Sequence, residues 1–200
     1  MSDNDLDEMQ RDALQEIANI GMGRAGAALA QLLGTFVTLS VPNSQLISVS
    51  DLAHYLSEKN DGSKVVRQAF QSDISGEAIV MFGQDGYREL RELMGYESDA
   101  EKIELEMLSD IATLLVGGCV QSIFEQLGCI LSFTAPTFLS LNALIETLQP
   151  TLPIRWERAL LLRVHFTLEH GGFEAQLVML LPDDAIQSMK LVLDEFLNSL

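Results

Sequence analysis

The sequence has few basic residues, few histidines and only two cysteines. Its 200 residues include 12 Lys and Arg against 29 Asp and Glu, a formal net charge of −17, and three His. The excess of acidic side chains is spread evenly along the chain: residues 1–100 carry 7 basic and 16 acidic side chains, and residues 101–200 carry 5 basic and 13 acidic ones. Because proteins that bind a phosphate backbone cluster Lys and Arg on one face, this composition argues against a nucleic-acid partner.

Other absences narrow the class of protein. Cys119 and Cys129 stand in apolar contexts, which favours free thiols in a reducing cytoplasm over a disulfide. The scattered histidines give no Cys/His spacing typical of zinc, so we expect no metal or cofactor of the chain's own. There is no run of about 18 to 20 charge-free apolar residues and no secretory signal at the acidic N-terminus, so no membrane span is expected. The 48% of apolar residues indicate a folded globular protein.

The chain contains an internal repeat. Residues 16–42 align without a gap over residues 110–136, with six identities in 27 positions. The glycine and proline positions match as well, since a Leu-Gly pair, a β-branched run and a proline follow each other in both copies. The identical pairs are Ile17/Ile111, Ala18/Ala112, Gly23/Gly117, Leu33/Leu127, Gly34/Gly128 and Pro42/Pro136.

Hydrophobic periodicity predicts the elements of each copy. Apolar residues recur with a period near 3.6 over residues 8–32 and 101–127, which indicates two long helices. Asp5 or Asp7 is the candidate N-cap of the first helix, and Gly34 is expected to end it. Strands are expected at 35–41 and 45–49, and hairpins at 66–82 and 160–181 with turns near Asp73–Gly76 and His170–Gly172. The prediction is one α/β (α+β) domain of two repeats, about 8–95 and 101–198. Its mixed or antiparallel sheet would carry the two long helices on one face, related by a pseudo-twofold axis.

The first long helix carries a polar pair in an apolar context. Glu16 and Asn19 are three residues apart, so they project from the same side of the helix. Gly21 and Gly23 follow, and each glycine inside a helix costs about 1 kcal/mol relative to alanine. A helix face without side-chain bulk would let another surface approach closely. The Glu16 and Asn19 pair is therefore a candidate for insertion into a pocket of a partner protein. The alternative is a solvated Glu and Asn, with glycines that serve helix packing.

The segment LQEIANIGMGRAGAALAQLLG is similar to the Glu-x-x-Asn signature helix of the CheC/CheX/FliY family of chemotaxis phosphatases. The family pattern has a glycine where this chain has Ala18. The resemblance extends over nearly the whole chain, through the duplication, the Val-Pro after the first strand, the strand GEAIVMF and the closing helix. The length matches the two-repeat CheC type.

The resemblance implies a hydrolase that removes phosphate from the aspartyl phosphate of CheY-like response regulators in bacterial chemotaxis. It implies that Asn19 orients the attacking water and that Glu16 pairs with a lysine of the regulator. Positioning of water is most of what an acyl phosphate needs, and a carboxamide brings no charge that would repel it. Any Mg²⁺ would belong to the partner receiver domain.

The second copy departs from this pattern. Asp110 and Thr113 stand where the first copy has Glu16 and Asn19, so a weak or inactive second site is expected, or one that docks without positioning water. Gly117 and Gly118 are the corresponding candidates for close approach. Two alternatives remain open: an adaptor that binds phosphorylated receiver domains or a CheD-type deamidase without catalysis, and a structural component of the flagellar switch.

Overall fold

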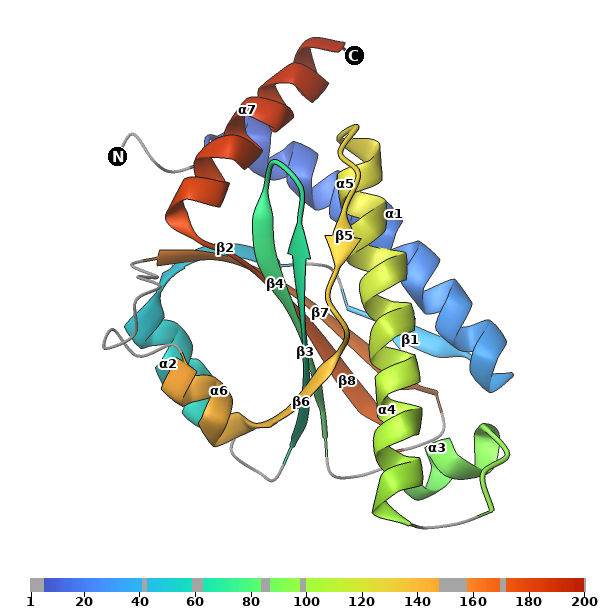
Figure 1. Cartoon of the computed structure of the whole chain (residues 1–200). Helices are drawn as coiled ribbons and strands as arrows, with labels where there is room; N and C mark the ends of the chain where they lie inside the picture. Colours follow the sequence, from blue (N-terminus) through green and yellow to red (C-terminus); the bar gives the residue numbers. More distant parts are fainter. Residues whose placement is uncertain are drawn as a thin grey trace.

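The chain passes twice through the order long helix, two strands, helix, two strands, helix (Figure 1). The computed structural model describes residues 6–40, 43–58, 63–83, 87–97, 100–147, 158–169 and 172–199. The first passage consists of α1 (Glu8–Leu33), β1 (Val37–Leu39), β2 (Asn43–Ser48), α2 (Val49–Glu58), β3 (Lys64–Gln71), β4 (Ser75–Phe82) and α3 (Tyr87–Leu93). The second consists of α4 (Glu101–Val116), the π-helix η1 (Gly117–Gln121), α5 (Ser122–Gln126), β5 (Ser132–Phe133), β6 (Thr137–Ser140), α6 (Leu141–Thr147), β7 (Arg158–Leu168), β8 (Glu174–Leu181) and α7 (Asp183–Ser199).

The strands form one antiparallel sheet that interlocks the two halves. Its main order is β1-β7-β8-β4-β3-β5, with β2 also paired to β7 and β6 also paired to β3. The hairpins β3–β4 and β7–β8 lie side by side at the centre. Each half therefore adds its first two strands to the hairpin of the other half, so neither half completes its sheet alone.

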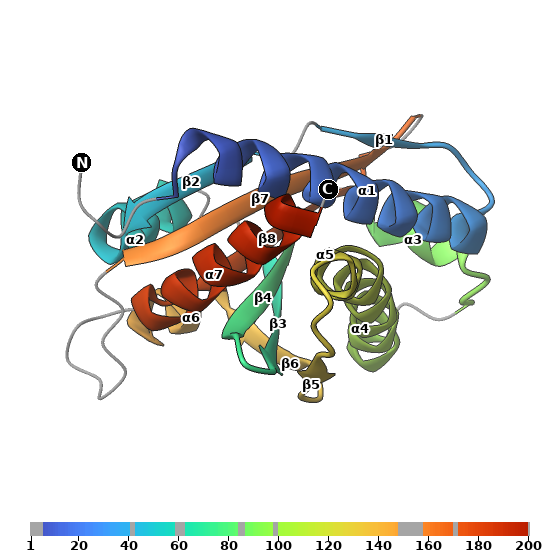
Figure 2. The same ribbon diagram turned by 90° about the horizontal axis from the view of Figure 1, so that it is seen from above.

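Each face of the sheet is covered by its own set of helices. The larger core lies under α1, α4, η1, α5 and α7, and it includes the inward side chains of β3, β4, β7 and β8. The smaller core lies under α2 and α6 on the opposite face, seen to the left of the strands in Figure 1. Figure 2 shows α1 passing over the upper side of the molecule, with α4 and α5 seen almost end-on beside it. Both predicted long helices thus lie on the same face, and the sheet is antiparallel throughout its described pairs.

The first helix begins and ends as its sequence predicts. Asp7 caps the start, since its side chain accepts from the Gln10 backbone N–H at 2.8 Å, and Gln10 Oε1 accepts from the Asp7 N–H at 3.0 Å. Gln10 Nε2 also donates to Asp194 Oδ1 of α7 at 2.8 Å, which fixes the first turn to the closing helix. Gly34 ends the helix with φ of 64°, a left-handed conformation that glycine adopts without steric cost.

The structure differs from the predicted elements in three places. The second long helix spans the predicted range but changes to a π-helix at Gly117–Gln121. Helices α2 and α6 occupy segments for which no helix was predicted. The hairpins at 64–82 and 158–181 confirm the predicted strands, while His170 and Gly171 of the second predicted turn lie outside the described residues.

One helical stretch of this fold is unusually apolar. By length and composition, Glu101–Gln126 is long and apolar enough to cross a membrane. In this fold 61% of its most apolar window is buried, and residues such as Leu108, Ile111 and Leu115 are fully enclosed in the larger core. The burial matches that of a core helix packed between a sheet and a neighbouring helix.

A hydroxyl group extends the pairing of both outer strands. Thr134 N donates to Ala69 O at 2.9 Å, and Ala69 N donates to Thr134 Oγ1 at 3.1 Å. At the position 94 residues earlier, Ser40 N donates to His165 O at 3.1 Å and His165 N donates to Ser40 Oγ at 3.0 Å. In both copies a proline follows two residues later and could not itself donate to a ladder. The hydroxyl therefore accepts a hydrogen bond from the backbone of the neighbouring strand just before the proline, where regular strand pairing ends.

We predict that Thr134→Val lowers the free energy of unfolding by about 0.5–1.5 kcal/mol, because the Ala69 N–H loses its acceptor while the side-chain shape is kept. Urea unfolding of the variant and the wild type measures the difference. Thr137→Val is the matched control, since Thr137 is an exposed threonine of the adjacent strand β6. Equal losses in the two variants would contradict this role of the hydroxyl.

Candidate functional site

The Glu16 and Asn19 pair lies on the outer side of α1. Glu16 is exposed and Asn19 is half-buried, while Ile17 and Ala18 between them are 2% and 0% exposed and pack into the larger core. The core side of α1 is thus fixed by burial, and the two polar side chains are held away from it. Ile20, next to Asn19, remains 42% exposed.

The two polar groups are uncompensated within the described part of the chain. Neither the Glu16 carboxylate nor the Asn19 amide has a hydrogen bond or ion pair to another described side chain, although α1 carries capping and inter-helix bonds elsewhere. A free carboxylate can pair with a cation, and a free carboxamide both donates and accepts hydrogen bonds. This arrangement leaves both groups available to a molecule that approaches α1 from solvent.

The second predicted pair occupies the corresponding outer surface of α4. Asp110 and Thr113 are both exposed, and Ile111 and Ala112, which lie between them in the chain, are fully buried. The carboxylate of Asp110 is one methylene shorter than that of Glu16, and a threonine hydroxyl lacks the reach of the Asn19 amide. The outer surface of α1 at Glu16 and Asn19, and that of α4 at Asp110 and Thr113, are therefore two similar surfaces with different chemical groups. We call them the first and the second platform.

The four glycines divide into two packed and two open positions. A Cβ on Gly21 would lie 2.8 Å from Cys119 O, and a Cβ on Gly118 would lie 2.6 Å from Ala25 Cα. A Cβ on Gly23 or Gly117 would meet no atom within 4 Å. Gly21 and Gly118 thus permit close approach between two helices of the chain, and not the approach of an outside molecule. For these two glycines the structure agrees with the alternative that they serve helix packing. Gly23 and Gly117 keep their surroundings open.

We predict opposite effects of alanine at Gly21 and Gly23. Gly21→Ala should destabilise the fold by about 1–3 kcal/mol, since the new Cβ forces the helix away from the Cys119 carbonyl. Gly23→Ala should raise the stability by about 0.5–1 kcal/mol, because the space is open and alanine favours the helix. Thermal and urea unfolding measure both. Two changes of the same sign would contradict the assigned packing.

The two cysteines are free; Cys119 is buried and Cys129 is half-buried. Burial raises the pKa of the Cys119 thiol to about 12. The pKa of Cys129 is also raised, first by partial burial and then by the negative charges of Asp73 and Glu195. Since the thiolate is the nucleophile, neither thiol is activated for catalysis near neutral pH. Within the described ranges, no three His, Cys, Asp or Glu side chains gather as a metal site.

We predict that thiol labelling at pH 8 is slow at Cys129 and occurs at Cys119 only on unfolding. Because the pKa of Cys129 is raised, its thiolate fraction and labelling rate should increase as the pH rises above the usual thiol range. Asp73→Asn should speed the labelling of Cys129 at a given pH by removing a nearby negative charge. A rate unchanged by Asp73→Asn, measured with a chromogenic disulfide, would contradict this electrostatic contribution.

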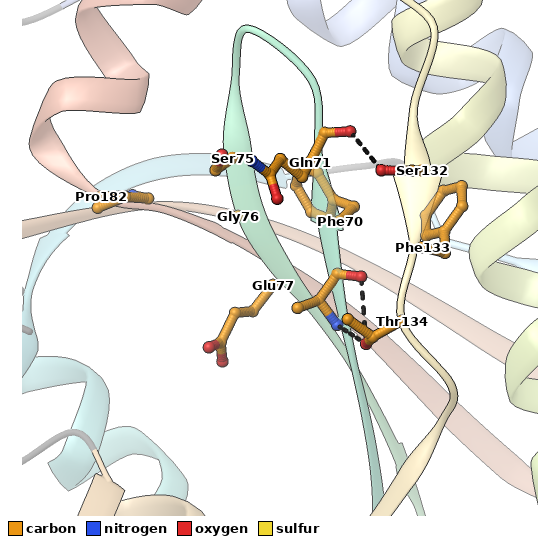
Figure 3. A pocket seen from close by; sticks show the side chains of 10 residues that line it. Phe70, Gln71, Ser75, Gly76, Glu77, Ser132, Phe133, Thr134 and Pro182 are labelled. Carbon is orange, nitrogen blue, oxygen red and sulfur yellow. Dashed lines mark hydrogen bonds between the residues drawn. The ribbon is translucent and has the colours of Figure 1, made fainter.

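A cavity of about 350 Å³ lies away from these residues, at the end of the β3–β4 hairpin (Figure 3). Strands β3, β4 and β5 and Pro182 line it, and of the described lining residues only Glu77 is ionisable. Glu77 is paired with Arg67. None of the predicted site residues lines this cavity. No sequence pattern indicated it, because its lining comes from three separate segments.

Comparison with known proteins bears on the helix that carries Glu16 and Asn19. Residues 9–44 match the CheC-like family. The first helix is CheC-like. "CheY-P phosphatase CheC" of Bacillus subtilis (strain 168) is 31% identical over 94 residues, which are 46% of this chain and 44% of that protein. "Flagellar motor switch phosphatase FliY" of the same organism is 25% identical over 178 residues, 84% of this chain and 44% of that protein. These matches confirm the predicted resemblance to the CheC/CheX/FliY family, and the chain spans less than half the length of either relative.

Solved structures share the fold of this chain. FliY of Thermotoga maritima superposes with a TM-score of 0.67 at 17% identity and covers 96% of this chain and 98% of its own. The FliM middle domain of H. pylori gives 0.68 at 8% identity, with 94% and 99% covered. CheX of Borrelia burgdorferi, solved in a complex with CheY, BeF3 and Mg²⁺, gives 0.53 at 14% identity, with 82% and 96% covered. The predicted α/β fold class is confirmed by these similarities.

Proposed function

We propose that the chain is a cytoplasmic phosphatase that hydrolyses the aspartyl phosphate of a CheY-like receiver domain. The observation that carries the proposal is the pair of uncompensated polar side chains, Glu16 and Asn19, on the outer side of a helix that matches the CheC-like family. The names of the two relatives, and the presence of CheY in the CheX crystal structure, support a receiver domain as the partner.

The proposed reaction uses the pair in two roles. The Asn19 amide orients a water molecule in line with the phosphorus atom of the receiver. The water attacks phosphorus, the bond from phosphorus to the aspartyl oxygen breaks, and the products are inorganic phosphate and a free carboxylate. Glu16 pairs with a lysine of the receiver and fixes the approach of α1. In this scheme any Mg²⁺ would belong to the receiver domain.

One working site per chain is part of the proposal. Asp110 and Thr113 are exposed like the first pair, but a threonine hydroxyl cannot reach as far as a carboxamide. In this scheme the second platform on α4 is inactive or docks a receiver without positioning water. Gly23 and Gly117 leave room beside each platform for an approaching surface.

A second candidate function is an adaptor without catalysis. The same fold occurs in the FliM middle domain, and the second platform has lost the Glu-x-x-Asn pair. An adaptor would bind a phosphorylated receiver, or a CheD-type deamidase, through the outer sides of α1 and α4. It would leave the rate of dephosphorylation unchanged.

We predict that the wild-type chain accelerates phosphate release from a phosphorylated CheY-like receiver and that Asn19→Ala lowers this activity about 100-fold, as for loss of one group that acts at the reacting atoms. Glu16→Gln should chiefly weaken binding to the receiver. Gln15→Ala is the matched control, because Gln15 is an exposed amide of the same helix. Phosphate release is followed with a receiver charged by acetyl phosphate.

The same assay separates the two candidates. Acceleration by the wild type that Asn19→Ala abolishes supports the phosphatase. Binding to a beryllofluoride-loaded receiver with a decay rate equal to that of the receiver alone supports the adaptor. Full activity of Asn19→Ala would contradict the assigned site.

A further inference from the structure

The segment of α1 that carries Asn19 is held by side chains of the second half. Gln126 Nε2 of α5 donates to Ile17 O at 3.2 Å and to Ser122 O at 3.1 Å. Ile17 lies between Glu16 and Asn19, so this bond reaches the backbone inside the polar pair. Helix α5 therefore has a polar contact to α1 at the turn that presents both side chains.

Further contacts follow along the same side of α1. The Cys119 carbonyl lies against Gly21, where a Cβ would come within 2.8 Å. Arg24 Nη1 donates to Ser122 Oγ at 2.8 Å, and Arg24 is also 3.8 Å from a Glu125 carboxylate oxygen. Together with Gln126, these groups contact α1 at residues 17, 21 and 24, which recur at helical spacing on one side. The helical turn that contains Asn19 is thus held by a contact at Ile17, before Asn19 in the chain, and by contacts at Gly21 and Arg24 after it.

The brace is not reciprocal between the two copies. In the repeat, Leu32 occupies the position of Gln126, and Ala28 occupies the position of Ser122. Neither side chain can donate or accept a hydrogen bond, and Leu32 is 42% exposed. The second copy therefore contacts the helix of the first copy through Gln126 and Ser122, whereas the first copy has only apolar side chains at the two corresponding positions. The copy that has the Glu-x-x-Asn pair is thus the one whose helix receives these polar contacts, and the copy that lacks the pair is the one that provides them.

We infer that Gln126 is a positioning residue for Asn19, and that the α5 end of the second copy serves as a brace for the working site of the first. The inference rests on the proposed function. A water-positioning amide must be held to a fraction of an ångström, because small displacements of a reacting group have large effects on rate. The Gln126 bond to Ile17 O and the Arg24 bond to Ser122 limit rotation and sliding of α1 at the turn where Asn19 projects.

The test is Gln126→Met, which keeps the size of the side chain and removes its amide. With a phosphorylated CheY-like receiver as substrate, kcat should fall about tenfold, while the affinity for the beryllofluoride-loaded receiver changes less than about twofold. Gln121→Met is the matched control, since the Gln121 amide at the end of η1 bonds only Glu125 of α5 among the described contacts and does not reach α1. It should retain the wild-type kcat.

A double-mutant cycle distinguishes positioning from general destabilisation. If Gln126 acts through Asn19, Gln126→Met adds no further loss in an Asn19→Ala background. Amide hydrogen exchange near Gly21 should also speed up in Gln126→Met and not in Gln121→Met. Ser122→Ala, which removes only the acceptor of Arg24, provides a second variant and should lower kcat in the same direction, by about threefold.

Equal kcat values for Gln126→Met and Gln121→Met would overturn the inference, as would full additivity with Asn19→Ala. Failure of this inference is distinct from failure of the proposed function. An active wild type that loses activity in Asn19→Ala but not in Gln126→Met refutes only the brace. A wild type that does not accelerate phosphate release refutes the proposed function itself.

Discussion

The close crossing of α1 with the π-helix η1 is the contact on which the rest of the structure depends. The Cys119 carbonyl of η1 lies over Gly21, and Ala25 of α1 lies over Gly118. No larger residue fits at either glycine without moving a backbone, so the distance between the two long helices is set by these two positions. Leu14, Leu108 and Ile111 are fully buried in the larger core beneath these helices. The outward direction of Glu16 and Asn19 follows from the same burial.

The strands of the two copies are interlocked in one sheet. Strands β1 and β2 pair with β7, and strands β5 and β6 pair with β3, so each half contributes the edge of the other's hairpin. The hydroxyls of Ser40 and Thr134 make the same exchange of hydrogen bonds in the two halves. Against this symmetric background the differences are concentrated on the outer helices, where one copy has kept Glu16 and Asn19 and the other supplies Gln126 and Ser122 as support.

Local signals in the sequence predicted the parts of the structure that depend on neighbours in the chain. The 3.6-residue period and the Asp7 and Gly34 caps placed α1 almost to the residue, and alternating runs placed both hairpins. Helix α2 was missed although Ser48 accepts from the Asp51 N–H and thereby marks its start. Ten residues are too short for periodicity alone to identify a helix.

Features that depend on tertiary contact could not be read from the sequence. The π-helix arises where Gly118 packs on Ala25, and the separate contributions of Gly21 and Gly23 depend on which side of α1 meets η1. The support of Ile17 by Gln126 joins residues 109 apart, so no local pattern could indicate it. Glu16 and Asn19 were identified from their spacing and from the similarity of their helix to the Glu-x-x-Asn signature. Composition alone could not indicate them, because exposed Glu and Asn residues are common on protein surfaces.

The most direct test of the central claim is a crystal structure of this chain with a CheY-like receiver loaded with beryllofluoride and magnesium. The account predicts that the receiver's phosphorylation site lies against the outer side of α1, with the Asn19 amide within hydrogen-bond distance of the beryllofluoride or of a water beside it, and with Glu16 paired to a receiver lysine. A receiver seated elsewhere, such as at the cavity near Glu77, with Asn19 remote from the beryllofluoride, would contradict it.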